Sequence, residues 1–159
     1  MASMIDFAKL DLRGAFDLAI MIEEDAQMRY EDFARAFAGK ASAAATVFRD
    51  MAVNEAKHCR QLEERRREIF AQDPPRIEIS VKDEEDGVER AELGELEDGP
   101  ITARQALEIA LEAEVRAYEF YKNALPALKN EDVRKFFEHL MEEENEHQDL
   151  LRKKLGSIR

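Results

Sequence analysis

Two copies of the pattern Glu-x-x-His have residue types and a spacing that suit metal binding. They are Glu55 with His58 and Glu144 with His147. In an α-helix, residues three apart lie on the same face one turn apart, so each pair can direct a carboxylate oxygen and an imidazole nitrogen toward one point. A lone pair of this kind is more often part of a solvated helix face. Two pairs in matching surroundings favour a metal site.

Two further glutamates lie where apolar residues are expected. Glu23 and Glu114 each interrupt a stripe of apolar residues that recur every three or four positions, and each precedes a tyrosine by seven residues, Tyr30 and Tyr121. A single glutamate at such a position is usually at a helix edge or protonated. We interpret the tyrosines either as core aromatics or as donors of hydrogen bonds to the ligand carboxylates.

The two halves of the chain repeat this pattern. Glu23 and Glu114 are 91 residues apart, and the two Glu-x-x-His pairs are 89 residues apart. Such an internal repeat of one helical hairpin predicts a pseudo-twofold bundle in which six ligands meet at one depth. The predicted metal ligands are Glu23, Glu55, His58, Glu114, Glu144 and His147.

The charge of this set predicts which metals it binds. Burial of four unpaired carboxylates would cost several kcal/mol each unless something neutralised them. Two divalent cations would balance four carboxylates. Mixed carboxylate and imidazole ligation suits iron or manganese better than a closed, thiolate-rich zinc site. We therefore predict two Fe ions, with Mn and Zn as alternatives.

Four segments with apolar residues at spacings of three and four predict the helices that position these ligands. Thr102 with Gln105 predicts a capping box, Asn130 predicts the next N-cap, and Gly156 predicts the end of the last helix. In the third segment we expect buried side chains at Leu107, Leu111, Tyr118, Tyr121 and Leu125. The predicted helices span about 12–38, 43–71, 103–125 and 131–155.

A long crossover is predicted between the second and third helices. Pro74 and Pro75 end the second helix, and residues 73–100 are rich in Asp, Glu and Gly, with one alternation at 76–81 that suggests a brief strand. Two hairpins joined by so long a connection predict an all-α fold, a four-helix bundle forming one domain over residues 1–159.

Composition limits the function classes. The 159 residues carry a net charge of −12 with no basic run, which argues against a nucleic-acid partner. No apolar stretch approaches the roughly 18 residues of a membrane span, and the first residues lack the features of a signal peptide. The single cysteine, Cys59, excludes an intramolecular disulfide and fits a cytoplasmic location, which we expect.

The ligand set resembles the ferritin-like di-iron carboxylate superfamily, over essentially the whole chain. More closely it is similar to the rubrerythrin and erythrin branch, through the motifs Glu23-x-x-Ala26-x-x-x-Tyr30, Glu55-Ala56-Lys57-His58 and Glu144-Asn145-Glu146-His147. This resemblance implies a ferritin-like four-helix bundle and two-electron reduction of O₂ or peroxide. It also implies that Glu55 and Glu144 bridge the metals, that Glu23 and Glu114 are terminal ligands, and that His58 and His147 each bind one ion.

Two departures from rubrerythrins refine these expectations. The chain lacks the four cysteines of their rubredoxin-like domain, which implies an external electron donor. Ala117 stands where rubrerythrins carry an extra glutamate, which favours a ferroxidase or bacterioferritin-like site over a peroxidase. The expected substrates are peroxide, O₂ or Fe²⁺, and the expected assembly is a homodimer. A non-catalytic iron-storage or iron-transfer protein, and a metal-free helical interaction module, are the alternatives.

Overall fold

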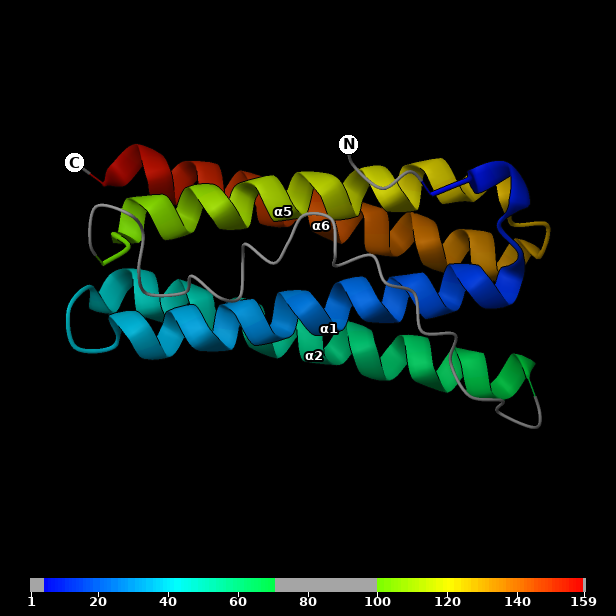
Figure 1. The fold of residues 1–159 in the computed structure, drawn as a ribbon, viewed down its shortest axis with the longest axis horizontal. Coiled ribbons are helices and arrows are strands. Elements are labelled where there is room, and N and C mark those ends of the chain that lie inside the picture. The colour runs from blue at the N-terminus through cyan, green and yellow to red at the C-terminus, as the bar shows by residue number, and fades with distance from the viewer. Residues whose placement is uncertain (1–4, 71–99, 159) are drawn as a thin grey trace.

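The protein is described by a computed structural model that covers residues 5–70 and 100–158, and this part of the chain contains helices and no strand. Figure 1 shows four long helices lying side by side. Short 3-10 helices at Phe7–Lys9 and Leu125–Ala127 accompany them. The long helices are α1 (Leu12–Phe37), α2 (Ser42–Ile69), α5 (Ala103–Ala124) and α6 (Glu131–Ser157).

Local capping fixes where the helices begin. The side chain of Asp11 accepts a hydrogen bond from the backbone N–H of Gly14 at the start of α1. Thr102 and Gln105 form the predicted capping box on α5, and Asn130 caps α6. Each cap satisfies N–H groups that the first helical turn leaves without partners.

The ends of the helices deviate more from prediction than their starts. α2 ends at Ile69, two residues before its predicted end. α6 continues through Gly156 to Ser157, so the prediction that Gly156 stops it is wrong. Glycine is tolerated inside a helix, and no left-handed residue is needed because the chain leaves α6 in extended geometry at Ile158. The predicted strand at 76–81, and the predicted crossover except Pro100, lie outside the described residues.

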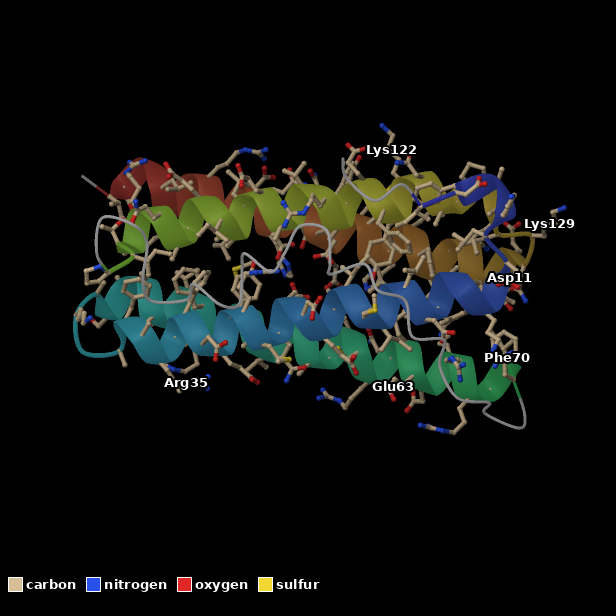
Figure 2. All side chains as sticks on the ribbon, viewed as in Figure 1. Asp11, Arg35, Glu63, Phe70, Lys122 and Lys129 are labelled. Carbon is tan, nitrogen blue, oxygen red and sulfur yellow. The ribbon has the colours of Figure 1, made fainter. Side chains whose placement is uncertain are left out.

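The helices pair as two antiparallel hairpins, α1 with α2 and α5 with α6 (Figure 1). Figure 2 shows that Asp11, Phe70 and Lys129 all lie at one end of the bundle, which fits these directions. α2 ends where α6 begins, whereas α5 begins at the opposite end (Figure 1). This is the arrangement that a long crossover between the second and third long helices requires, and the predicted all-α bundle is confirmed.

Two apolar clusters fill the bundle. The first contains large side chains from all four helices, Phe16, Ile20, Leu62, Tyr121 and Phe137. The second does so as well, with Phe33, Phe48, Met51, Leu107 and Leu151. Aromatic contacts such as Phe16 with Phe137 at 5.7 Å join the hairpins. The buried polar residues described below therefore have an apolar cluster on each side.

The buried stripe of α5 differs from the predicted one. Leu111, Tyr118 and Leu125 are only partly buried. The buried small residues are instead Ala106, Ala110, Ala117 and Ala124. Alanines let neighbouring helices approach closely, which places the larger side chains at the margins of the interface. None of the described helices has the length and apolarity that crossing a membrane would require.

Candidate metal centre

All six predicted ligands meet in the layer between the two apolar clusters. They come from all four helices: Glu23 from α1, Glu55 and His58 from α2, Glu114 from α5, and Glu144 and His147 from α6. Five of them are no more than 2% exposed, and His147 is 8% exposed. Burial of this many ionisable groups together is costly without compensation, so the layer is a candidate functional site.

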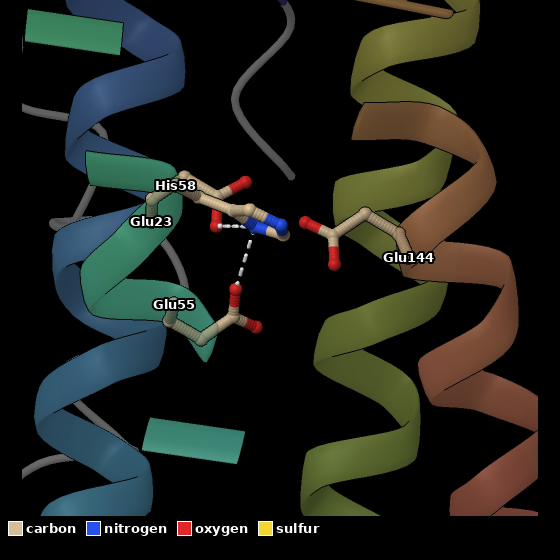
Figure 3. Close-up of side chains that lie close together, drawn as sticks. All are labelled: Glu23, Glu55, His58 and Glu144. Atoms are coloured by element: carbon tan, nitrogen blue, oxygen red, sulfur yellow. Dashed lines mark hydrogen bonds and ion pairs between the residues drawn. The ribbon is translucent and has the colours of Figure 1, made fainter. Parts of the chain in front are cut away.

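The six residues form two overlapping groups of four. One consists of Glu23, Glu55, His58 and Glu144, and the other of Glu55, Glu114, Glu144 and His147. In each group the potential ligand atoms lie within 4.8 Å of one another. Figure 3 shows the first group, with the side chains of α1 and α2 directed toward Glu144 on α6. Because Glu55 and Glu144 belong to both groups, two adjacent ions could share these carboxylates.

The two imidazoles face this cluster through the same ring atom. His58 Nδ1 lies 3.1 Å from Oε1 of Glu23 and 3.0 Å from Oε1 of Glu55 (Figure 3). His147 Nδ1 lies 3.3 Å from Oε1 of Glu114 and 3.2 Å from Oε1 of Glu144. The rings are stacked with centroids 6.0 Å apart. Each Nδ1 is therefore placed to bind one ion, and each Nε2 is available for a contact elsewhere.

The two tyrosines make reciprocal hydrogen bonds across the hairpins. The hydroxyl of Tyr30 on α1 donates to Oε2 of Glu114 at 2.5 Å, and the hydroxyl of Tyr121 on α5 donates to Oε2 of Glu23, also at 2.5 Å. Both rings are buried, at 1% and 0% exposure, in the apolar clusters. Each tyrosine is therefore both a core aromatic and a hydrogen-bond donor to a carboxylate, so both interpretations from the sequence apply.

Three buried carboxylate oxygens accept no hydrogen bond of good geometry, although a histidine Nδ1 lies 3.0–3.5 Å from each of them. They are both oxygens of Glu55 and Oε1 of Glu144, the two residues common to both groups. A buried acceptor without a partner costs about 1–3 kcal/mol. Two divalent cations would satisfy these atoms and balance the four carboxylates, so the residues present fit a two-metal site.

The carboxyl groups divide into two types by pKa. Burial, reinforced by the charges of Glu23 and Glu114, raises the pKa of Glu55 to about 8 and that of Glu144 well above its usual range. Burial acts in the same sense on Glu23, but the hydrogen bond and charge of His58 outweigh it and lower the pKa of Glu23 to about 2. The pKa of Glu114 is lowered in the same way by His147. Without metal, burial therefore favours the protonated form of the shared carboxyls, and the histidines favour the ionised form of the other two.

Both histidines are protonated in the metal-free cluster. Burial opposes this, but hydrogen bonds and charges from Glu23 and Glu55 raise the pKa of His58 to about 11. Glu114 and Glu55 likewise raise the pKa of His147 to about 10. Two imidazolium cations then balance two carboxylates. A metal ion that entered would take the place of these protons, because imidazole and carboxylate bind metals in their deprotonated forms.

Sequence reasoning missed Glu143. Its Oε1 lies 2.8 Å from Nε2 of His58, the ring atom that faces away from the cluster, and its Oε2 lies 2.6 Å from Nε2 of His139. Burial opposes ionisation, but the hydrogen bond and charge of His58 lower the pKa of Glu143. The side chain of His139 is 53% exposed. Glu143 is one of several consecutive glutamates in the sequence, and no spacing signal singles it out.

Two other positions near the cluster bring no further ligand. Cys59 is buried, and burial followed by the charge of Glu23 raises the pKa of its thiol to about 12, so it stays a neutral thiol. Ala117 is buried on α5 and carries no carboxylate. The potential ligands in this cluster are therefore the six residues named above.

Comparison with known proteins agrees with this geometry. The family model described as rubrerythrin matches residues 15–155. A crystal structure of an uncharacterized conserved protein from Magnetospirillum magnetotacticum MS-1 superposes with a TM-score of 0.70 and 26% identity, covering 93% of this chain and 95% of that one. No curated protein matches the sequence.

Proposed function

This chain belongs to the rubrerythrin family, and we propose that its core cluster binds two iron ions and reduces peroxide or O₂. The enzyme would then be a peroxidase or a ferroxidase. The ligands would be Glu23, Glu55, His58, Glu114, Glu144 and His147, with Glu55 and Glu144 shared between the ions.

One observation carries this proposal. The two groups of potential ligands overlap in Glu55 and Glu144, and both oxygens of Glu55 and Oε1 of Glu144 are buried without a hydrogen bond of good geometry. A single ion would use one group and leave part of the other uncompensated. A donor set of oxygen and imidazole nitrogen, with no thiolate, supports iron or manganese over a structural zinc site.

The side chains prepare this site before any ion binds. Tyr30 and Tyr121 hold one oxygen each of Glu114 and Glu23, which leaves the other oxygen of each carboxylate directed at a histidine. Apolar clusters on both sides keep bulk water away. When bound, two neighbouring iron ions supply two electrons to an acceptor such as peroxide or O₂.

Repeated turnover needs a source of electrons. With one cysteine, the chain cannot form the four-cysteine iron site of a rubredoxin-type donor. We therefore propose that an external protein or small-molecule donor re-reduces the metals.

Iron storage or transfer without catalysis is the second candidate. Ala117, at the position where rubrerythrins have an additional glutamate, argues against a rubrerythrin-type peroxidase, which leaves a ferroxidase or iron handling. A site for iron handling would oxidise a pair of Fe²⁺ ions once, with O₂ or peroxide as the oxidant, and pass the iron on.

Turnover distinguishes the two candidates. Protein loaded with Fe²⁺ without oxygen would receive excess reductant and then measured additions of hydrogen peroxide or O₂. Consumption of many equivalents per chain would support the enzyme, whereas one oxidation event per pair of irons would support iron handling. Glu55→Ala should abolish either response, and Glu64→Ala, a change at an exposed glutamate of α2, should leave it unchanged.

A further inference from the structure

The internal repeat breaks at the residue directly before each Glu-x-x-His. On α6 this residue is Glu143, and at the equivalent position on α2, 89 residues earlier, it is Asn54. Each half therefore offers the same three types of ligand, two glutamates and one histidine, but the residue beside the Glu-x-x-His differs. A carboxylate in one half corresponds to a neutral amide in the other.

Within the described residues, only one of the two histidines has a carboxylate beside the ring nitrogen that faces away from the cluster. Glu143 Oε1 lies 2.8 Å from Nε2 of His58, and His139 lies 2.6 Å from the other oxygen of Glu143. Within the described residues, Nε2 of His147 makes no hydrogen bond, and the buried Oδ1 of Asn54 accepts none. The asymmetry is thus a matter of contacts as well as of sequence.

Such a contact changes how an imidazole binds a metal. A ring whose far N–H donates to a carboxylate is fixed in one tautomer and orientation, and its metal-binding nitrogen becomes more basic. His58 has this arrangement, with Nδ1 toward Glu23 and Glu55 and Nε2 toward Glu143. Nδ1 of His147 likewise faces two carboxylates, Glu114 and Glu144, but its Nε2 faces no carboxylate within the described residues.

We propose that Glu143 is a positioning residue for His58 and makes the two metal positions unequal, so that the first ion binds in the group of Glu23, Glu55, His58 and Glu144. The second ion then occupies the group that contains His147. This inference rests on the proposed two-metal function, which it deepens by assigning an order of binding.

Stepwise binding of Co²⁺ tests the order. Co²⁺ is a suitable probe because its visible absorption reports its ligands, and a competing chromophoric chelator gives both dissociation constants. In the wild type the two constants should differ. Glu143→Gln keeps the shape of the side chain and removes its charge, and it should weaken the first step by about 10–100-fold. Asn54→Ala is the matched control at the equivalent position and should change neither step.

Variants with one histidine assign the effect to one position. His147→Ala keeps the group around His58, and His58→Ala keeps the group around His147. Glu143→Gln should weaken Co²⁺ binding and shift the Co²⁺ spectrum in the His147→Ala background, and should do neither in the His58→Ala background. A purely structural role would affect both backgrounds alike.

The outcomes separate this inference from the proposed function. Two Co²⁺ ions bound with equal affinity, or an equal loss of both on Glu143→Gln, would overturn the order of binding and leave the two-metal site intact. Absence of Co²⁺ binding by the wild type would overturn the two-metal function itself. If neither single-histidine variant binds Co²⁺, the wild-type, Glu143→Gln and Asn54→Ala titrations decide the matter.

Discussion

The hydroxyl of Tyr30 on α1 donates a hydrogen bond of 2.5 Å to Glu114 on α5, and this contact joins the two helical hairpins at the depth of the candidate metal centre. Tyr121 makes the same contact in the reverse direction, to Glu23. Each tyrosine thus belongs to one hairpin and orients a ligand of the other. The assembly of the bundle and the arrangement of the site therefore depend on the same contacts.

Removal of one of these hydroxyls should destabilise the metal-free protein. Tyr30→Phe leaves the ring in the core and takes a donor from a buried carboxylate, so we expect a loss of about 1.5–3 kcal/mol in the free energy of unfolding. Urea denaturation would measure it. Tyr118→Phe is the control, because the hydroxyl of Tyr118 makes no hydrogen bond within the described residues. Equal effects of the two changes would contradict the role of the Tyr30 hydroxyl.

The stability of the metal-free protein should fall as the pH rises. Folding raises the pKa of Glu55 from 4.5 to about 8, of His58 from 6.5 to about 11 and of His147 from 6.5 to about 10. The folded state therefore binds more protons than the unfolded state at neutral pH, and the stability that these protons provide is lost as the pH rises through 8 to 11. Thermal unfolding between pH 6.5 and 10 would measure it. A melting temperature that rises over this range would contradict the protonation states assigned here.

Metal binding should release protons. At pH 7, protons on Glu55, His58 and His147 must leave before these groups can bind ions, so about three protons should be released for two ions. Glu144, whose pKa is also raised, adds to this release. Affinity should accordingly increase with pH. Titration calorimetry of Co²⁺ binding in buffers with different ionisation enthalpies would count the protons. Release of fewer than about one proton per ion would show that the ligands are already deprotonated.

Loss of a shared carboxylate should remove both ions without unfolding the bundle. Glu55→Ala deletes two buried oxygens that accept no hydrogen bond of good geometry, so the metal-free variant should keep its helical content and unfold cooperatively. Metal analysis should find no tightly bound ion in it. The surface change Glu64→Ala should retain both ions. Two ions in Glu55→Ala would disprove the bridging role.

The cluster of six residues could be predicted from the sequence because its parts are repeated. One Glu-x-x-His on a helix has several explanations, but two of them with two further glutamates at constant offsets indicate one shared site. Helix starts were predictable for a similar local reason, since Thr102 and Asn130 cap the turns that immediately follow them. Signals that act within a few residues can be read from the chain directly.

Features that depend on neighbouring helices could not be predicted. The contact between Glu143 and His58 joins α6 to α2, and nothing in the spacing along α6 distinguishes Glu143 from the exposed glutamates beside it. On α5 the spacing of large apolar residues predicts burial of Leu111 and Tyr118, but the alanines beside them are the buried residues. Close packing of the hairpins prefers the small residues at the interface.

The number of iron ions bound per chain tests the central claim most directly. Fe²⁺ would be titrated into the metal-free protein under anaerobic conditions, and protein-bound iron would be determined by elemental analysis after desalting. We predict two ions per wild-type chain and a large rise in melting temperature on loading, because binding stabilises the folded state. Absence of tightly bound iron, with an unchanged melting temperature, would mean that the cluster of four glutamates and two histidines is structural and that the proposed function is wrong.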